Sequence, residues 1–224
     1  MNIALLLILP FSGAVATFIA GKIEKKYAFI FAEIIGFTLF ALVLGTFFSY
    51  TKPIDLAVEW FTFGNTTLPF GIYIDELSLV MLLIATGLGA LDIHFSHDYM
   101  KDDPDQARYY AKILFFIGGM ILLVSAKELI GLFVGWEFMG LASYLLISFW
   151  HTTKAPADAG VAAFLYTKFG DIFLFAAIGL LFYYTGTLDL QKINLYASWH
   201  QIPDNVSFVI AIFIFIAAIG KSGQ

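Results

Sequence analysis

The sequence predicts an all-α bundle of about seven transmembrane helices, and three observations support this fold class. Hydrophobic residues make up 60% of the 224 residues and charged residues only 13%, which is too apolar for an ordinary soluble domain. The apolar runs approach the ~20 residues that a helix needs to cross a bilayer, and they are too long for the alternating strands of a membrane barrel. Helices also satisfy their own backbone hydrogen bonds in lipid.

Seven apolar runs define the expected helices. They cover residues 2–20, 27–50, 77–94, 111–126, 129–149, 159–185 and 206–219. The third, fourth and seventh runs are short for a full crossing. The first run resembles a signal peptide only in hydropathy, because it lacks a charged start and a convincing cleavage site before the Lys22 cluster. We therefore interpret it as a retained span.

Two connections are longer than the others, residues 51–74 and 186–205. Within the first, residues 57–74 alternate aromatic and polar side chains around Gly64 and Asn65. Alternation interrupted by turn-forming residues indicates a β-hairpin. We expect a small hairpin lying on the membrane surface.

Basic residues in the connections predict the orientation, because cytoplasmic loops carry more lysine and arginine than external loops. Seven basic residues fall on one side and three on the other. The first set is Lys22, Lys25, Lys26, Lys101, Arg108, Lys112 and Lys154, and the second is Lys52, Lys127 and Lys192. We therefore expect a multi-pass protein of a bacterial or archaeal cytoplasmic (inner) membrane with its N-terminus outside.

The composition excludes several kinds of chemistry for this chain. It has no cysteine, so disulfides, thiolate zinc sites, iron–sulfur ligation and thiol catalysis are excluded. The net charge of −5 is spread over the loops without a basic stripe, which argues against nucleic-acid binding. We expect no cofactor in the chain and assign any redox chemistry to a partner.

Four ionisable residues stand out in or at the end of the expected spans, where each charge costs ~2.5 to 3.5 kcal/mol on insertion scales. Glu137 lies eight residues into its span, at a depth of ~12 Å. Lys168 and Asp171 are three residues apart, on one helical face. Lys221 follows a long apolar run. Such residues normally face the bundle interior and have a partner.

Two interpretations of these charges remain open from the residues alone. As structural ion pairs, Lys168 would bind Asp171, and Glu137 would bind Lys221. As a proton relay, the groups would exchange protons, because burial favours the neutral form of an ionisable group and pairing favours its charged form. We favour the relay, since a structural bundle packs well without such charges. Glu137 and Lys221 are then the coupled central pair, and Lys168 lies on the route to them from the cytoplasm.

The remaining polar motifs give weaker signals. His94 and His97 are candidate proton-entry groups at the cytoplasmic end of their span, although interfacial histidines are usually solvated anchors. Asp75 and Glu76 fit the favourable placement of acids at a helix N-terminus better than a proton role.

The segment Gly220-Lys221-Ser222 is not a phosphate-binding loop. Position 215 is phenylalanine where such a loop requires glycine, and a membrane helix rather than a strand precedes it. We interpret the segment as a helix interruption at membrane depth, of the kind tolerated where it lines a cavity.

Residues 132–147, LFVGWEFMGLASYLLI, resemble the antiporter-like membrane subunits of respiratory complex I, and are most similar to the subunit L (mitochondrial subunit 5) type. Three further segments agree in the right order, which are residues 75–78 with 94–100, residues 168–171 and residues 220–224. The Gly-Trp-Glu and Gly-Lys-Ser motifs are specific in combination, whereas either one alone is weak.

The resemblance implies roles for the same four residues. Glu137 matches the essential mid-membrane glutamate of the family, Lys221 matches its lysine partner on a broken seventh helix, and Asp171 matches a nearby acid. Lys168 stands where the family often has arginine, which keeps the charge but loses the planar fork. The resemblance also implies inverted repeats and a chain roughly twice as long.

The family further implies a function and a division of the chain. The expected function is proton translocation in an NADH-quinone oxidoreductase-type complex, driven by electron transfer in partner membrane and peripheral subunits. Residues 1–74 would hold two spans and an external hairpin-like loop, residues 75–110 the third span and a cytoplasmic loop, and residues 111–224 an incomplete first repeat ending in the broken helix.

Several alternatives to this function remain. One is a subunit of a Mrp-type cation/proton antiporter, and another is a structural membrane scaffold. Gly-Trp-Glu-Phe-Met-Gly at residues 135–140 favours the complex I type. The electron donor, whether nicotinamide, deazaflavin or ferredoxin, is left open, as is proton against sodium transport.

Overall fold

The computed structural model describes residues 4–63, 66–198 and 202–223. The first four helices are α1 (Ala4–Ile23), α2 (Lys25–Ser49), α3 (Glu76–Tyr99) and α4 (Gln106–Ser125). The other four are α5 (Leu129–Ile147), α6 (Lys154–Thr185), α7 (Leu190–Ser198) and α8 (Asp204–Ser222). Between α2 and α3 lie the strands β1 (Ile54–Phe63) and β2 (Thr66–Ile74).

Seven of the described helices are long and apolar enough to cross a membrane, so the predicted bundle of about seven spans is confirmed. Three spans were predicted too short. Helices α3, α4 and α8 have 24, 20 and 19 residues, because their ends continue through polar residues that lower the hydropathy without breaking the helix. The short helix α7, inside the long connection 186–205, was not predicted.

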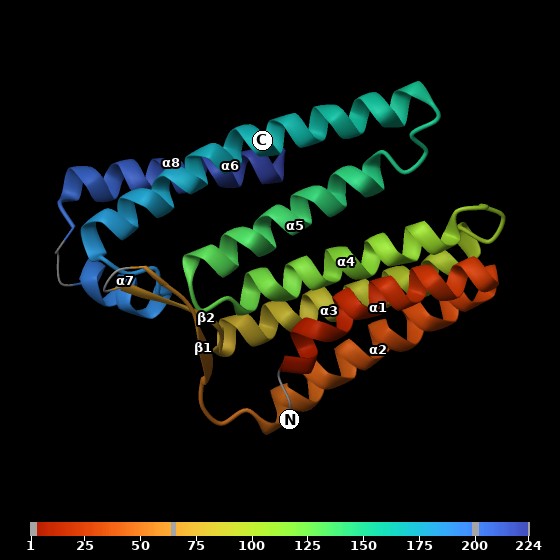
Figure 1. Ribbon diagram of the computed structural model, residues 1–224, viewed down its shortest axis with the longest axis horizontal. Coiled ribbons are helices and arrows are strands. Elements are labelled where there is room, and N and C mark those ends of the chain that lie inside the picture. Colours follow the sequence, from red (N-terminus) through yellow and green to blue (C-terminus); the bar gives the residue numbers. More distant parts are fainter. Residues whose placement is uncertain (1–3, 64–65, 199–201, 224) are drawn as a thin grey trace.

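The helices form a four-helix bundle with three further helices layered on it (Figure 1). Helix α1 packs on α2 and α4, and α3 completes the bundle by packing on the same two helices. Helix α5 then lies on α4, α6 on α5, and α8 on α6. The connections α1–α2, α3–α4 and α5–α6 lie at one end of the molecule, and the hairpin and α7 lie at the other.

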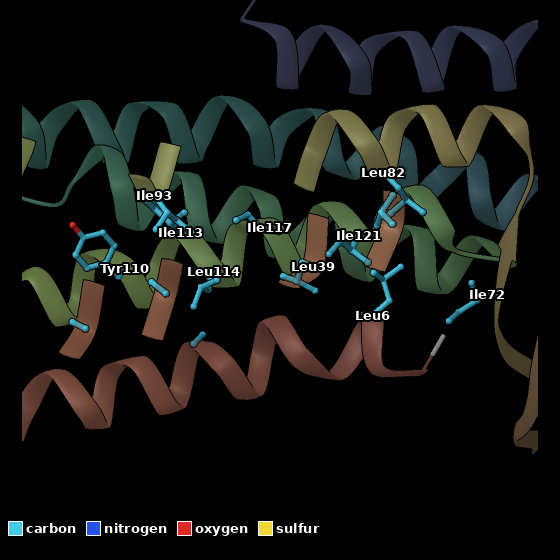
Figure 2. Close-up of a cluster of buried hydrophobic side chains, with 14 of the residues drawn as sticks. Leu6, Leu39, Ile72, Leu82, Ile93, Tyr110, Ile113, Leu114, Ile117 and Ile121 are labelled. Carbon is cyan, nitrogen blue, oxygen red and sulfur yellow. The ribbon is translucent and has the colours of Figure 1, made fainter. Parts of the chain in front are cut away.

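Aliphatic side chains from all four bundle helices form the main core (Figure 2). Leu39 of α2 and Leu114 and Ile121 of α4 are fully buried. Ile72 of β2 joins this cluster, so the hairpin is packed against one end of the bundle. Burial of this kind holds α4 as a fixed platform for α5.

The predicted hairpin is confirmed, and it begins three residues earlier than expected. Its strands pair antiparallel from Ile54 opposite Ile74 onward, with an irregularity between Glu59 and Phe61. The turn at Gly64 and Asn65 lies outside the described residues. Asp75, which follows the hairpin, caps α3 by accepting a hydrogen bond from the Ser78 N–H at 2.8 Å. This is the helix-terminal role preferred for Asp75 from the sequence.

Candidate functional site

Lys168 of α6 lies between two carboxylates. Its ammonium donates a hydrogen bond to Oε2 of Glu137 on α5 and lies 3.1 Å from Oδ2 of Asp171, one turn along its own helix. The Asp171 side chain is only 5% exposed, whereas the Glu137 and Lys168 side chains are 29% and 30% exposed. One cation therefore serves two acids, so the group carries a formal charge of −1 when all three side chains are ionised.

Trp136, next to Glu137, joins this group to α8. Its indole Nε1–H donates a hydrogen bond to Oδ1 of Asp171 at 2.6 Å. On the other side, the Lys221 ammonium of α8 donates to the Trp136 carbonyl oxygen at 3.1 Å and lies 5.3 Å from the centre of the indole ring. A contact with the π-face of the ring is favourable for a cation. The order of contacts is therefore Lys221, Trp136, Asp171, Lys168 and Glu137.

One of the two ion pairs considered as the structural interpretation is absent. Glu137 binds Lys168 rather than Lys221, and Lys221 binds the Trp136 backbone one residue away. Sequence depth placed Glu137 and Lys221 at similar heights, but it contained no information on which way each side chain points around its helix. The expected contact between Lys168 and Asp171 is present.

Trp136 is the contact residue that reasoning from charges missed. It appeared in the sequence only as part of the Gly-Trp-Glu motif. The sequence did contain a signal for this contact. Trp136 lies next to the charged Glu137, and a buried indole N–H usually finds a hydrogen-bond partner.

Three glycines allow α8 to approach the site. A Cβ atom at Gly140 would lie 2.6 Å from the Lys221 ammonium, so the bare α5 backbone leaves the space that this ammonium occupies. Gly170 of α6 and Gly220 of α8 face each other, with the Gly170 Cα 3.2 Å from where a Cβ would stand at Gly220. Small residues let transmembrane helices approach closely. Backbone contact thus brings Lys221 beside the α5–α6 group.

A cavity of about 690 Å³ adjoins Lys221 between α4, α5, α6 and α8. Its wall is mainly apolar, and its polar side chains include Ser143 and Tyr144 of α5 and Thr167 of α6. Helix α8 ends at Ser222, and Gly223 is left-handed with φ 70°, which is the usual C-terminal cap of a helix. Lys221 lies on the edge of this cavity.

The arrangement provides two alternative partners for one ammonium group. The Lys168 ammonium lies within ion-pair distance of both the Glu137 and the Asp171 carboxylates. The Trp136 N–H also stabilises Asp171.

The two histidines contact other helices. Nδ1 of His94 lies 2.6 Å from Oε1 of Glu33 on α2, and the His97 ring packs at 4.1 Å from the Phe29 ring, also on α2. None of the contacts described for them reaches α5, α6 or α8. They lie toward the end of α3 from which the α3–α4 connection leaves.

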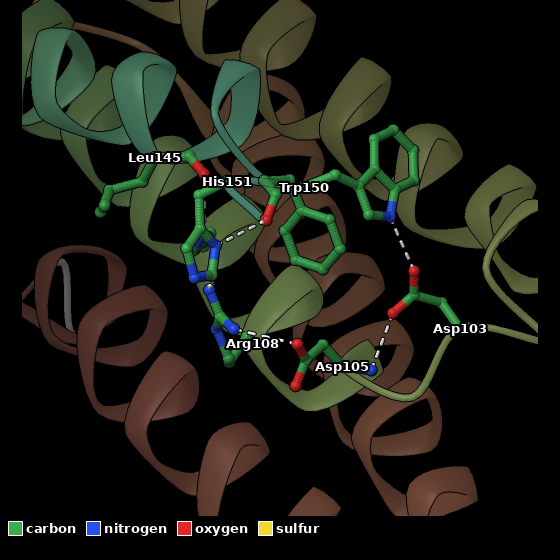
Figure 3. A network of polar contacts seen from close by, with 8 residues as sticks. Asp103, Asp105, Arg108, Leu145, Trp150 and His151 are labelled. Atoms are coloured by element: carbon green, nitrogen blue, oxygen red, sulfur yellow. Dashed lines mark hydrogen bonds and ion pairs between the residues drawn. The ribbon is translucent and has the colours of Figure 1, made fainter. Parts of the chain in front are cut away.

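The C-terminal end of α5 lies at the same end of the molecule and is held by a polar network (Figure 3). Arg108 donates to Asp105 at 2.9 Å and lies 3.5 Å from Nδ1 of His151, while the Trp150 indole donates to Asp103 at 2.9 Å. Lys112 of α4 donates to the Leu145 carbonyl in the last turn of α5 at 2.8 Å. A cation at this position satisfies a terminal carbonyl and matches the helix dipole.

Comparison with known proteins agrees with this architecture. The profile of the family described as NADH:quinone oxidoreductase/Mrp antiporter, TM, matches residues 126–224. The profile described as NADH-Ubiquinone oxidoreductase (complex I), chain 5 N-terminus, matches residues 60–110. All four charged residues of the site fall within the first match.

The NADH-quinone oxidoreductase subunit L of Escherichia coli is 34% identical over 177 residues, covering 79% of this chain and 28% of the relative. The subunit L of Mycobacterium tuberculosis is 31% identical, covering 98% of this chain and 36% of the relative. The chain thus spans about a third or less of these relatives.

Among solved structures, a chain of the Mrp complex from Dietzia sp. superposes with a TM-score of 0.85 at 26% identity. The match covers 98% of this chain and 24% of that one. The two profiles together with these relatives identify the chain as a member of the antiporter-like membrane subunit family of NADH-quinone oxidoreductase and Mrp complexes.

Proposed function

We propose that the chain acts in a proton-translocating membrane subunit of an NADH-quinone oxidoreductase (complex I)-type assembly. The observation that carries the proposal is the position of Lys168 between Glu137 and Asp171, with Lys221 joined to the same group through Trp136. Electron transfer takes place in partner subunits, and this chain contributes no redox group. Its part is to hold protons and release them at mid-membrane.

In this mechanism Lys168 is the moving group. Its transfer from Glu137 toward Asp171 leaves Glu137 to accept a proton, and its return stabilises the carboxylate, so the proton leaves. Lys221 provides a second cation at the edge of the cavity, where a proton can pass between the cavity and the group. Such an arrangement with two states can couple a remote event to proton movement.

We assign the end that carries Arg108, Lys112 and Lys154 to the cytoplasm because it collects most of the basic residues. His94 and His97 lie toward this end, and we propose them as proton-entry groups. Their support is position and chemistry, because imidazole titrates near neutral pH and His94 is already paired with a carboxylate, Glu33.

The proposal is tested with Glu137→Gln in the full-length chain within the assembled complex in liposomes. Electron transfer and proton uptake are measured separately, and Glu59→Gln, an exposed carboxylate of β1, is the matched control. We expect Glu137→Gln to lower the protons moved per electron while the control leaves that ratio unchanged. If Glu137→Gln pumps as well as the unmodified complex, the assigned role is wrong.

The Mrp-type antiporter is the second candidate, and the superposition on the Dietzia Mrp complex favours it specifically. The two candidates differ in their driving force. Proton flux that depends on a sodium gradient and proceeds without any electron donor would establish the antiporter. A structural scaffold would instead tolerate neutralisation of all four charges, provided that the complex still assembled.

A further inference from the structure

The short connection between α4 and α5, residues 126–128, pairs its backbone on both sides. The Lys127 N–H donates to the Gly71 carbonyl of β2 at 3.1 Å, and the Lys127 carbonyl accepts from the Leu190 N–H of α7, also at 3.1 Å. Single bridges join Ala126 to Ile72, and Glu128 to Asp189. The connection therefore lies like a middle strand between the hairpin and the segment that leads into α7.

The side chains of this connection also contact the hairpin and the segment before α7. Glu128 is 2% exposed, and its two carboxylate oxygens accept from different elements, Oε1 from the Gly131 N–H of α5 at 3.1 Å and Oε2 from the Gly71 N–H of β2 at 3.3 Å. Lys127 forms an ion pair with Asp55 of β1, and its ammonium lies 4.0 Å from Asp189. One carboxylate thus caps α5 and holds the hairpin at once.

The position of α5 along its own axis determines where Glu137 lies relative to Lys168. Glu137 lies nine residues after Glu128, ~13.5 Å along the helix. The α5 backbone is also pressed against α4, because a Cβ at Gly135 would lie 2.5 Å from the Leu123 nitrogen. A helix packed this closely moves as a rigid rod, so a shift where it begins reaches Glu137 and its contact with Lys168.

We propose that Glu128 is a positioning residue for Glu137, which clamps the start of α5 to the hairpin and thereby sets how Glu137 meets Lys168. The inference rests on the proposed function for its importance to transport, and on the contacts of Glu128 for its geometry. The C-terminal end of α5 is held by Lys112, and the segment after it by Trp150. Glu128 holds the other end, where α5 begins, to the hairpin.

The clamp is sensitive to pH in a defined direction. Around Glu128, the charged groups are Asp189 before α7, Lys127 in the connection and Asp55 of β1 beyond it, while β2 and α5 contribute backbone N–H groups. Burial raises the pKa of Glu128 above its ordinary value, against the backbone hydrogen bonds that lower it, and Asp189 raises it further. A carboxyl with a raised pKa favours its buried position at low pH and loses that advantage as pH rises through the raised value.

The test compares Glu128→Ala with Glu128→Gln in the full-length chain within the assembled complex, with Glu59→Ala as the exposed control. Glutamine keeps an acceptor oxygen and mimics the protonated acid, whereas alanine removes both hydrogen bonds. The first readout is hydrogen–deuterium exchange of peptides covering residues 66–75 and 129–132. The second is the infrared titration of the Glu137 carboxyl, assigned by its loss in Glu137→Gln.

We expect Glu128→Ala to speed exchange in both peptides about tenfold, the size typical for loss of a helix cap, and to shift the Glu137 titration. Glu128→Gln should leave both readouts near the unmodified values and remove the pH dependence of the exchange. Unchanged exchange in Glu128→Ala would refute the clamp, and faster exchange with an unshifted Glu137 titration would refute the positioning role.

Neither readout requires proton pumping. If Glu137→Gln leaves pumping intact, the proposed function fails, while the positioning of Glu137 by Glu128 is still decided by the exchange and the titration. Conversely, a Glu137→Gln variant that stops pumping, with a Glu128→Ala variant that changes neither readout, refutes the clamp and leaves the function standing.

Discussion

The bundle α1–α4 and the layer α5, α6 and α8 differ in which side chains lie between their helices. In the bundle, large aliphatic side chains such as Leu39 and Leu114 fill the space between helices and are fully buried. In the layer, α6 and α8 cross at Gly170 and Gly220, the charged side chains lie beside this crossing, and a smaller apolar cluster that includes Leu174 and Ile178 packs next to them. The difference is that large aliphatic side chains fill the bundle, whereas the charged side chains of the site gather in the layer.

The boundary between the two regions is a backbone contact, where Gly135 of α5 meets Leu123 of α4. The largest effect is therefore expected from Gly135→Val, because its Cβ has no room and neither backbone can yield cheaply. We expect loss of folded protein, measured as the monodisperse fraction after detergent extraction and size-exclusion chromatography. Gly45→Ala is the control, because a Cβ at Gly45 meets nothing within 4 Å. A folded Gly135→Val variant would show that the layer is not fixed to the bundle there.

The next effect tests the bundle alone. Leu39→Ala leaves a cavity in a fully buried region, and such changes cost about 2–5 kcal/mol in protein cores. We expect a lower temperature of thermal unfolding, with proton translocation per assembled complex unchanged. Equal losses in stability and in pumping would mean that bundle and layer are one unit.

Lys168→Met tests the layer, and here we expect loss of pumping with assembly retained. It leaves Glu137 and Asp171 without their shared cation, so the proton affinity of the group changes while the apolar stem of the side chain is largely kept. We expect at least about tenfold slower proton translocation, equivalent to about 1.4 kcal/mol of barrier, with assembly retained. Lys168→Arg keeps the charge and should restore most of the rate. Normal pumping by Lys168→Met would reduce the residue to a structural role.

Trp136→Phe is expected to have the smallest effect of the four. It keeps the ring beside Lys221 and the backbone carbonyl, and removes only the N–H donor to Asp171. A hydrogen bond to a charged group contributes about 1.5–3 kcal/mol, whereas Lys168→Met removes a whole charge. We expect a pumping rate between those of the unmodified protein and Lys168→Met. A pumping rate below that of Lys168→Met would mean that the hydrogen bond to Asp171 matters more for pumping than the charge of Lys168.

Sequence reasoning found the spans and the hairpin because their signals are local. Hydropathy marks a helix wherever it packs, and alternation marks the strands. It identified Glu137, Lys168, Asp171 and Lys221 and the contact of Lys168 with Asp171, but the direct ion pair of Glu137 with Lys221, considered as the structural alternative, is absent from the structure. Depth follows from counting residues, whereas the direction of a side chain depends on how helices rotate against each other. That rotation is set by contacts such as Gly170 against Gly220, which no single segment contains.

Helix α7 and the clamp at Glu128 were missed for a related reason. Residues 190–198 are too short and too polar to resemble a span, and their helix is held by pairing with the Lys127 carbonyl, far away in the sequence. Glu128 looked like an ordinary polar residue at the start of a span. The hairpin packs against Glu128 and buries its carboxylate, which then joins β2 to α5.

The crossing of Gly170 and Gly220 gives α8 a fulcrum beside its functional end. Lys221 is the residue immediately after the crossing, whereas Asp204 lies sixteen residues before it, ~24 Å away along the helix. A tilt of ~10° about this point moves the Asp204 end by ~4 Å and the Lys221 Cα by well under 1 Å. The Lys221 backbone is thus displaced far less than the Asp204 end when α8 tilts about this crossing.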